Sequence, residues 1–474
     1  MKIVLLELNS DLLWREGYNP KLVDTLTKLQ LLEDSHYEKP ILVVISNIYE
    51  NESLLSSEVY MTKFFNKLKD LKISKFFEPF RERMIINPIK TVIPYSLFKT
   101  AINKQFENFP LHHAVFVSTN SENIMQARSL GITSLQIKGD GIQNADTEEL
   151  ENFLSGIERI LLYSPCCKKL REAKNFSYSQ VNKSKKIDPT IKKIIKNVNI
   201  DNLFSSIKRL TEFGSRWSNS PNINEVPKWV TKQFKTIGYS EEKEIDYLFF
   251  NLPGSSINPH SNIICKKIGK RKEQILICCH YDSISETPMS KAPGADDNAS
   301  GVAATIEIAR IIKDLPMEHS VIFAVFGGEE QGLFGSAACA EQAVLENWPI
   351  KLVINLDMIS YQEPGIPSKI IIEYDQGNKV SNNDTKAKAF AMIMAQAAAD
   401  YTDLKVAHTD IWNSDYIPFE EKGFSCIGVY NGTDNPFYHT VSDTIDRVDM
   451  NHFKEVVRMV LASIIQIDKE GINL

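Results

Sequence analysis

Side chains of the kinds that bind metal ions recur directly after predicted buried strands in the second half of the chain. Two histidines and several carboxylates belong to five short segments, Cys278–Ser283, Gly294–Gly301, Gly327–Ser336, Asn355–Met358 and Asn435–Thr440. In open α/β sheets, ligands bind outside the carboxyl ends of the strands. This pattern therefore favours an α/β fold with its site at one edge of a sheet.

Three of these segments are expected to meet at that edge, because each follows an apolar strand pattern. They carry His280, the pair Glu329 and Glu330, and Asp357. Imidazoles and carboxylates around one crevice suit a borderline cation, and zinc is its natural occupant.

Each motif alone has an ordinary structural explanation. Strand-end histidines, Asp-Asp-Asn turns before helices and charged loops are common without a metal. One such motif carries roughly a one-in-ten prior as a metal site. Five in one chain, mostly at strand ends, make the metal interpretation much stronger than the ordinary one.

The 474-residue chain is long enough for two domains. Residues 1–165 alternate short strands with helical patterns, as in a parallel α/β domain. Residues 166–199 hold ten basic residues against two acidic ones and are predicted to be a linker. Residues 200–474 form a second α/β domain. Its strands are predicted at 275–279, 321–326, 352–356, 370–373 and 426–430, and its helices at 203–210, 229–237, 301–312, 386–399 and 453–467.

Composition narrows the class further. A hydrophobic fraction of 43% and a charged fraction of 24% are typical of a globular protein. The net charge of −6 gives no reason to expect nucleic acid as a partner, and no apolar run is long enough for a membrane span. Seven cysteines at low density, without a visible signal peptide, favour a cytoplasmic setting, with non-classical export left open.

From about residue 200 onward, the five segments resemble the M28 family of zinc aminopeptidases in order and spacing. The resemblance implies a zinc-exopeptidase domain with a mixed sheet flanked by helices, two zinc ions per chain, and peptide or protein N-termini as substrates. The resemblance implies that His280 and Asp357 bind one zinc and that Glu330 and His439 bind the other. It implies that Asp296 bridges the two zinc ions.

The same resemblance assigns the remaining catalytic roles. Glu329 resembles the general base, which takes a proton from water and returns it to the leaving amine. Asp282 resembles the acid that orients the first histidine ligand. The Asp296–Asp297 peptide is often cis in the family. Asp415, Tyr438 and Met358 are candidates for the substrate pocket, although a loop cap and plain packing explain them about as well.

Residues 1–165 resemble, in degenerate form, the haloacid-dehalogenase-like (HAD-like) phosphatase fold. Val43–Asn47 and Ala114–Ile132 match its later motifs, but Glu7 and Asn9 replace the two aspartates of its first motif, and Ser118–Asn120 replaces an acidic magnesium ligand. Without an aspartate nucleophile, phosphoryl transfer is not expected. The domain is expected to serve self-association, partner docking or regulation, or simply to stabilise the peptidase domain.

Three alternatives remain open on the sequence alone. Glutaminyl cyclases share much of the scaffold and use a single zinc, but they lack the histidine that corresponds to His280. An M28-type carboxypeptidase would have the same metal ligands. A catalytically inactive binding protein is the third, although all five ligand types and Glu329 are present.

Overall fold

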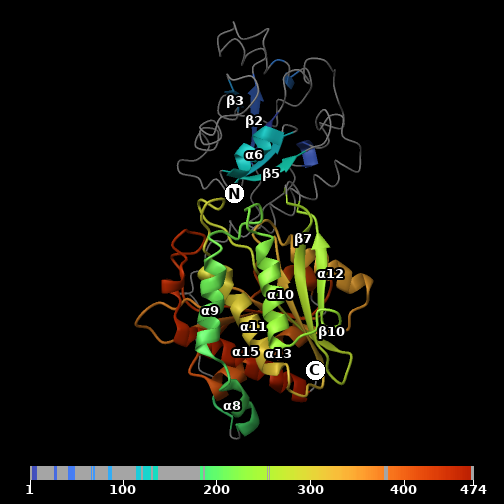
Figure 1. Cartoon of the computed structure of the whole chain (residues 1–474), viewed down its shortest axis with the longest axis vertical. Helices are drawn as coiled ribbons and strands as arrows, with labels where there is room; N and C mark the ends of the chain where they lie inside the picture. The colour runs from blue at the N-terminus through green and yellow to red at the C-terminus, as the bar shows by residue number, and fades with distance from the viewer. Residues whose placement is uncertain are drawn as a thin grey trace. The chain divides into compact units, whose positions relative to one another are not determined.

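The computed structural model describes residues 3–7, 26–28, 41–47, 66, 68–69, 84–87, 114–118, 121–129, 132–136, 182–184, 187–252, 255, 257–377, 380 and 383–470. The chain divides into two compact units (Figure 1). The first comprises Met1–Cys167 with Leu252–Ser256, and the second comprises Lys168–Asn251 with Ile257–Leu474.

The first unit contains a parallel sheet with the strand order β3-β2-β1-β4-β5. Its elements are β1 (Ile3–Glu7), β2 (Ile41–Asn47), β3 (Met84–Asn87), β4 (Ala114–Ser118), α6 (Ser121–Ser129) and β5 (Thr133–Gln136). Short apolar runs such as Ala114–Val117 are buried, as expected for strands covered on both faces. Asn9 and residues 119–120, which carry part of the HAD-like resemblance, lie outside the described residues.

The second unit is built on an eight-stranded mixed sheet with the order β12-β11-β13-β10-β8-β9-β7-β6. Its strands are β6 (Ile245–Phe250), β7 (His260–Lys267), β8 (Gln274–His280), β9 (Ser320–Phe326), β10 (Ile350–Leu356), β11 (Lys369–Tyr374), β12 (Lys405–Thr409) and β13 (Cys426–Asn431). The central strands β13, β10, β8 and β9 are parallel. Strand β7 runs antiparallel to β9 and to β6, and β11 runs antiparallel to β13. The mixed sheet flanked by helices confirms the expected fold class.

Helices cover the sheet because its strands are apolar on both faces. The helices are α8 (Pro189–Ile195), α9 (Ile200–Thr211), α10 (Glu225–Ile237), α11 (Ser300–Ile312), α12 (Phe334–Leu345), α13 (Asp384–Tyr401), α14 (Ile417–Glu420) and α15 (Met450–Glu470). Ile275, Ile277 and Cys279 of β8 share one buried core with residues of α8–α11, α13 and α15. Figure 1 shows α9, α10 and α11 side by side over the sheet. Phe326 of β9 stacks on Phe419 of α14 instead.

Helix α8 corrects the predicted linker. Asp188 caps the helix by accepting a hydrogen bond from Thr190 N at 2.7 Å, and Pro189 occupies the first turn. Ile191 and Ile195 are 2% and 3% exposed and belong to the core of the second unit. The many lysines in this segment made it look like a linker, so the sequence did not reveal this buried apolar pair. The expected linker at 166–199 therefore ends in a packed helix rather than running to residue 199.

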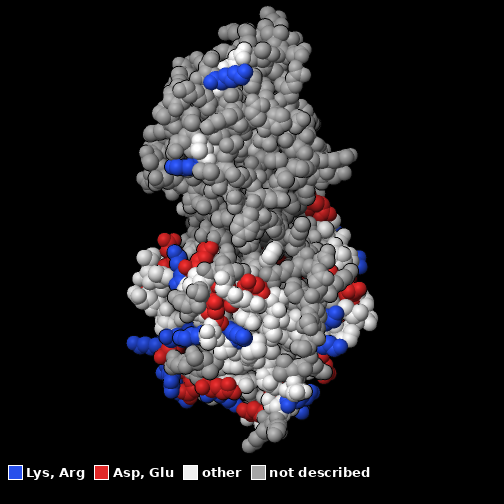
Figure 2. Space-filling view, turned by 180° about the vertical axis from the view of Figure 1, so that it is seen from behind, with Lys and Arg blue, Asp and Glu red and all other residues white. Residues whose placement is uncertain are grey.

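Charges of both signs are interspersed over the described surface of the second unit in the view of Figure 2. The helices of the described residues are all too short or too polar to cross a membrane.

Because α8 belongs to the core, shortening Ile191 should destabilise the second unit. Ile191→Ala is expected to lower the free energy of unfolding by about 2–4 kcal/mol. Lys192→Ala, on the exposed side of the same helix, should change it by less than about 0.5 kcal/mol. Denaturant unfolding of the full chain measures both. Equal, small effects would mean that α8 contributes nothing to the core.

Candidate metal centre

Three neighbouring parallel strands bring the proposed ligands to one edge of the sheet. Strand β8 lies between β10 and β9. His280 is the last residue of β8, Asp357 directly follows β10, and Glu329 and Glu330 follow β9 by a tight turn. Parallel strands end on the same side, so the topology places these side chains together.

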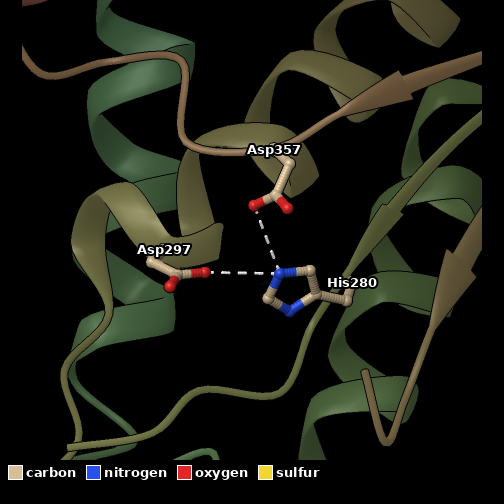
Figure 3. Close-up of side chains that lie close together, drawn as sticks. All are labelled: His280, Asp297 and Asp357. Atoms are coloured by element: carbon tan, nitrogen blue, oxygen red, sulfur yellow. Dashed lines mark ion pairs between the residues drawn. The ribbon is translucent and has the colours of Figure 1, made fainter. Parts of the chain in front are cut away.

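Distances divide the cluster into two halves that share Asp297. His280 Nε2 lies 3.3 Å from Asp297 Oδ1 and 3.4 Å from Asp357 Oδ1. Figure 3 marks both pairs with dashed lines. His439 Nε2 lies 3.1 Å from Asp297 Oδ2 and 3.2 Å from Glu330 Oε2. Each oxygen of the Asp297 carboxylate therefore faces a different imidazole.

These separations are compatible with atoms that bind one zinc ion together. Zinc binds His nitrogen and carboxylate oxygen at about 2.0–2.2 Å in a tetrahedral arrangement, which puts two ligand atoms about 3.3 Å apart. The four measured distances span 3.1–3.4 Å. The donor set of imidazole nitrogens and carboxylate oxygens also suits zinc. On geometry and chemistry, the residues fit two cations bridged by one carboxylate.

The carboxylate between the two imidazoles is that of Asp297, one residue after Asp296, which was expected there. The Asp296 carboxylate accepts hydrogen bonds from main-chain and side-chain donors of Ser360, Tyr361, Asn431 and Asn435, at 2.6–3.1 Å. Asp296 therefore has a structural role, because it holds these neighbouring segments together. The cis peptide is likewise shifted by one residue and joins Asp297 to Asn298. Two adjacent aspartates before a helix offer no sequence signal that separates these roles.

The tautomer of His280 follows from its main-chain contact. Its Nδ1 lies 3.1 Å from the main-chain oxygen of Asp282, which can only accept a hydrogen bond. In the neutral ring, Nδ1 therefore carries the proton, and Nε2 presents its lone pair to Asp297 and Asp357.

The carboxylate of Asp282 holds the two glutamates rather than the histidine. It accepts hydrogen bonds from Glu329 N at 3.2 Å and from Glu330 N at 3.1 Å, while its distance to His280 Nδ1 is 3.7 Å. Asp282 thus acts as a positioning residue. Glu329 Oε2 lies 4.0 Å from His280 Nε2, farther than the ligand pairs. Glu329 also belongs to a group, with His280 and Glu330, whose ligand atoms lie within 4.8 Å of one another.

Electrostatics show how strongly the cluster attracts positive charge. Burial lowers the pKa of His439, but Glu330 and Asp297 outweigh burial and raise that pKa to about 9. For His280, Glu329, Asp297 and Asp357 likewise outweigh burial and raise the pKa well above its usual value. Burial raises the pKa of Glu330 to about 7, although His439 acts against it. Without metal, protonated imidazoles would be the counter-ions.

Two buried residues that the sequence analysis missed hold the ligand-bearing loops. The guanidinium of Arg216 donates to the main-chain oxygens of Leu210, Tyr281, Pro293 and Gly294 at 2.5–3.2 Å. Asp443 accepts hydrogen bonds at 3.0–3.2 Å from the main-chain amides of Asp296 and its neighbour, residue 297. Their roles depend on tertiary contacts, which the sequence does not reveal. Only the position of Asp443, four residues after His439, indicates that it lies near the proposed ligands.

The three pocket candidates occupy different environments. Asp415 is fully buried, which raises its pKa to about 7, while His280 and the Ser336 hydroxyl act in the opposite direction. Tyr438 stacks its ring on that of His439, with 3.6 Å between centroids. Met358 is buried with a left-handed backbone (φ 54°).

Comparison with known proteins agrees with this geometry. The sequence model of peptidase family M28 matches residues 262–464. A "Probable leucine aminopeptidase" of Arthroderma otae is 28% identical over 290 residues, which cover 57% of this chain and 73% of that protein. A "Probable zinc metalloprotease" of Pyrenophora tritici-repentis is 29% identical over 221 residues, or 42% of this chain and 51% of that protein.

The crystal structure of LapB from Legionella pneumophila has a similar fold. Its TM-score is 0.53 at 20% identity, over 74% of this chain and 90% of that one. The family match adds to the arrangement of the histidines and carboxylates at the strand ends. Residues 262–464 are therefore a domain of peptidase family M28, and the chain is a zinc metallopeptidase, a hydrolase.

Proposed function

We propose that this protein is a two-zinc aminopeptidase that removes residues from the N-termini of peptides or proteins. The observation that carries the proposal is the position of the Asp297 carboxylate between His280 and His439 at 3.3 and 3.1 Å. One zinc would be held by His280, Asp357 and Asp297, and the other by His439, Glu330 and Asp297. Zinc bound there supplies Lewis acidity for the peptide carbonyl and lowers the pKa of a coordinated water.

The protein's own part in the reaction is proton transfer by Glu329. Its carboxylate is 1% exposed and lies beside the proposed ligands, so it can accept the proton of the attacking water and pass it to the leaving amine. A base must not be a tightly held ligand, and the 4.0 Å separation from His280 satisfies this condition. Asp282 keeps Glu329 in place by accepting a hydrogen bond from the main-chain amide of Glu329.

The aminopeptidase activity is favoured over the alternatives by two observations. The relatives of known description include a "Probable leucine aminopeptidase". His280 forms a further set of possible metal ligands with Asp297 and Asp357, and a single-zinc cyclase would not need this set. Trimming from the carboxyl end remains the second candidate, because the ligands do not report which terminus is bound. Asp415, Tyr438 and Met358 are proposed to shape the substrate pocket, Asp415 from its buried position and Tyr438 through its contact with His439.

For the first unit, we propose a degenerate HAD-like domain without phosphatase activity. Support comes from the parallel strand order β3-β2-β1-β4-β5 and from Glu7 at the end of β1, where the resembled fold has an aspartate nucleophile. Its proposed role is self-association or docking of a partner.

The central test compares neighbouring glutamates. Glu329→Ala should lower kcat on leucine p-nitroanilide by about 10²–10⁴-fold while zinc content stays at that of the wild type, because the base is lost but the ligands remain. Glu330→Ala should lose zinc and turnover together. Metal analysis and kinetics measure both. Unchanged turnover in Glu329→Ala would remove this residue from the mechanism.

A substrate panel with the wild type decides among the alternatives. The proposal requires release of the first residue from a free peptide and no cleavage of its N-acetylated form. Cyclisation of an N-terminal glutamine, or release of the last residue, would contradict it.

The adjacent aspartates should separate metal binding from stability. Asp297→Asn should reduce bound zinc from two ions per chain to one or none, because an amide cannot bridge two cations as a carboxylate does. Asp296→Asn should keep zinc but lower the free energy of unfolding by about 2–3 kcal/mol, because an amide nitrogen would face hydrogen-bond donors. Zinc content and chemical unfolding test this pair, and loss of zinc only in Asp296→Asn would reverse the assignment.

Zinc affinity should rise with pH. In the metal-free protein, the raised pKa of His439, about 9, means that its ion pairs stabilise the fold below about pH 6.5 and are lost as pH rises through about 9. Zinc requires the unprotonated ring and must displace this proton. The apparent zinc affinity should therefore increase about tenfold per pH unit for each displaced proton between pH 6.5 and 8. Calorimetry in buffers of different ionisation enthalpy counts the protons, and an affinity independent of pH would contradict the prediction.

A further inference from the structure

A second cluster of carboxylates is buried away from the proposed zinc ligands. Asp375 directly follows β11, Asp384 is the first residue of α13, and Glu420 is the last residue of α14. One carboxylate oxygen from each lies within 4.8 Å of the other two. Asp375 and Glu420 are 0% exposed, and Asp384 is half-buried, which leaves the cluster one side near solvent.

Glu420 is the residue that requires an explanation. In the described part of the chain, neither of its carboxylate oxygens has a hydrogen-bond partner. The amide of Asn383 and the thiol of Cys426 lie near it and lower its pKa, which favours the ionised carboxylate. However, Asn383 Nδ2 donates to Phe424 O at 2.6 Å, and the Cys426 thiol also contacts main-chain oxygens. A buried carboxylate without a partner is strongly unfavourable.

The other charges of the cluster increase this cost. Burial, together with the neighbouring carboxylates of Asp375 and Asp384, raises the pKa of Glu420 to about 7, although Asn383 and Cys426 act in the opposite direction. Burial also raises the pKa of Asp384, together with Asp375 and Asp410. Asp375 is already oriented, because its two oxygens accept hydrogen bonds from Gly377 N at 3.0 Å and from Val380 N at 2.9 Å.

We propose that Asp375, Asp384 and Glu420 bind a divalent cation of the calcium type, which links β11, α13 and α14. Calcium binds oxygen ligands at about 2.3–2.6 Å, so two of its ligands lie at most about 5 Å apart, and the oxygens of this cluster satisfy that limit. The side-chain oxygen of Asn383, also buried without a hydrogen-bond partner among the described residues, is available as a fourth ligand. The ligands are all oxygens, which favours calcium over zinc.

The cation would also order the segment that supports the zinc centre. Ser414 donates a hydrogen bond of 2.6 Å to Asp357 Oδ2, and Tyr416 Oη donates one of 2.5 Å to Glu373 of β11. Glu420 ends the same segment. A cation at Glu420 would therefore stabilise the contact between this segment and a proposed zinc ligand, without taking part in the reaction.

The test uses the zinc-loaded full chain in calcium-free buffer. Millimolar calcium chloride should raise the Tm of the wild type by about 5 °C, and calorimetry should detect one bound calcium ion per chain. Glu420→Gln should abolish both effects while zinc content is unchanged. The matched control is Glu421→Gln, since Glu421 is the next residue and is exposed; this variant should respond as the wild type does.

Asp384→Asn, at the half-buried position, gives a second variant if Glu420→Gln fails to fold, and it should weaken calcium binding at least tenfold. The proposal is overturned if calcium neither binds to the wild type nor raises its Tm, or if Glu420→Gln and Asp384→Asn respond as the wild type does. A Tm increase with magnesium but not with calcium would also overturn it. None of these measurements depends on peptidase activity.

Discussion

The arrangement of the proposed metal centre in the second unit depends on the contact between one carboxylate and two imidazoles. Asp297 places one oxygen against His280 and the other against His439, so two loops from distant parts of the sequence meet at a single side chain. Such a concentration of buried negative charge is stable only with a matching positive charge. Metal ions can provide this charge and protons can do so partly, so we expect metal binding, histidine protonation and fold stability to be linked.

The remaining architecture holds that contact in place. The parallel strands β10, β8 and β9 deliver Asp357, His280 and the two glutamates to one edge. Arg216 bonds to main-chain oxygens around two of the loops, and Asp443 fixes the main chain before Asp297. These residues touch no proposed reacting atom. They act through geometry, because a shift of a few tenths of an ångström would alter the spacing that a shared ion requires.

The sequence was informative wherever a property depends on local pattern. Apolar runs predicted the central strands within two residues, and the predicted helix end at residue 237 is followed by Gly238 with a left-handed φ of 107°. The sequence pattern did not predict the properties of a residue that depend on its tertiary contacts. The two adjacent aspartates are chemically identical, and only the donors from Ser360 and Asn431 show which of them is an anchor. Phe204 fits the apolar face of α9 by spacing, yet it is 43% exposed.

The clamp of Asp282 on consecutive amides has a mechanical consequence. Its two oxygens accept hydrogen bonds from the main-chain amides of Glu329, the proposed base, and Glu330, a proposed ligand, so one side chain restrains both residues. Under the proposed roles, the position of the base and the position of a metal ligand therefore both depend on the carboxylate of Asp282.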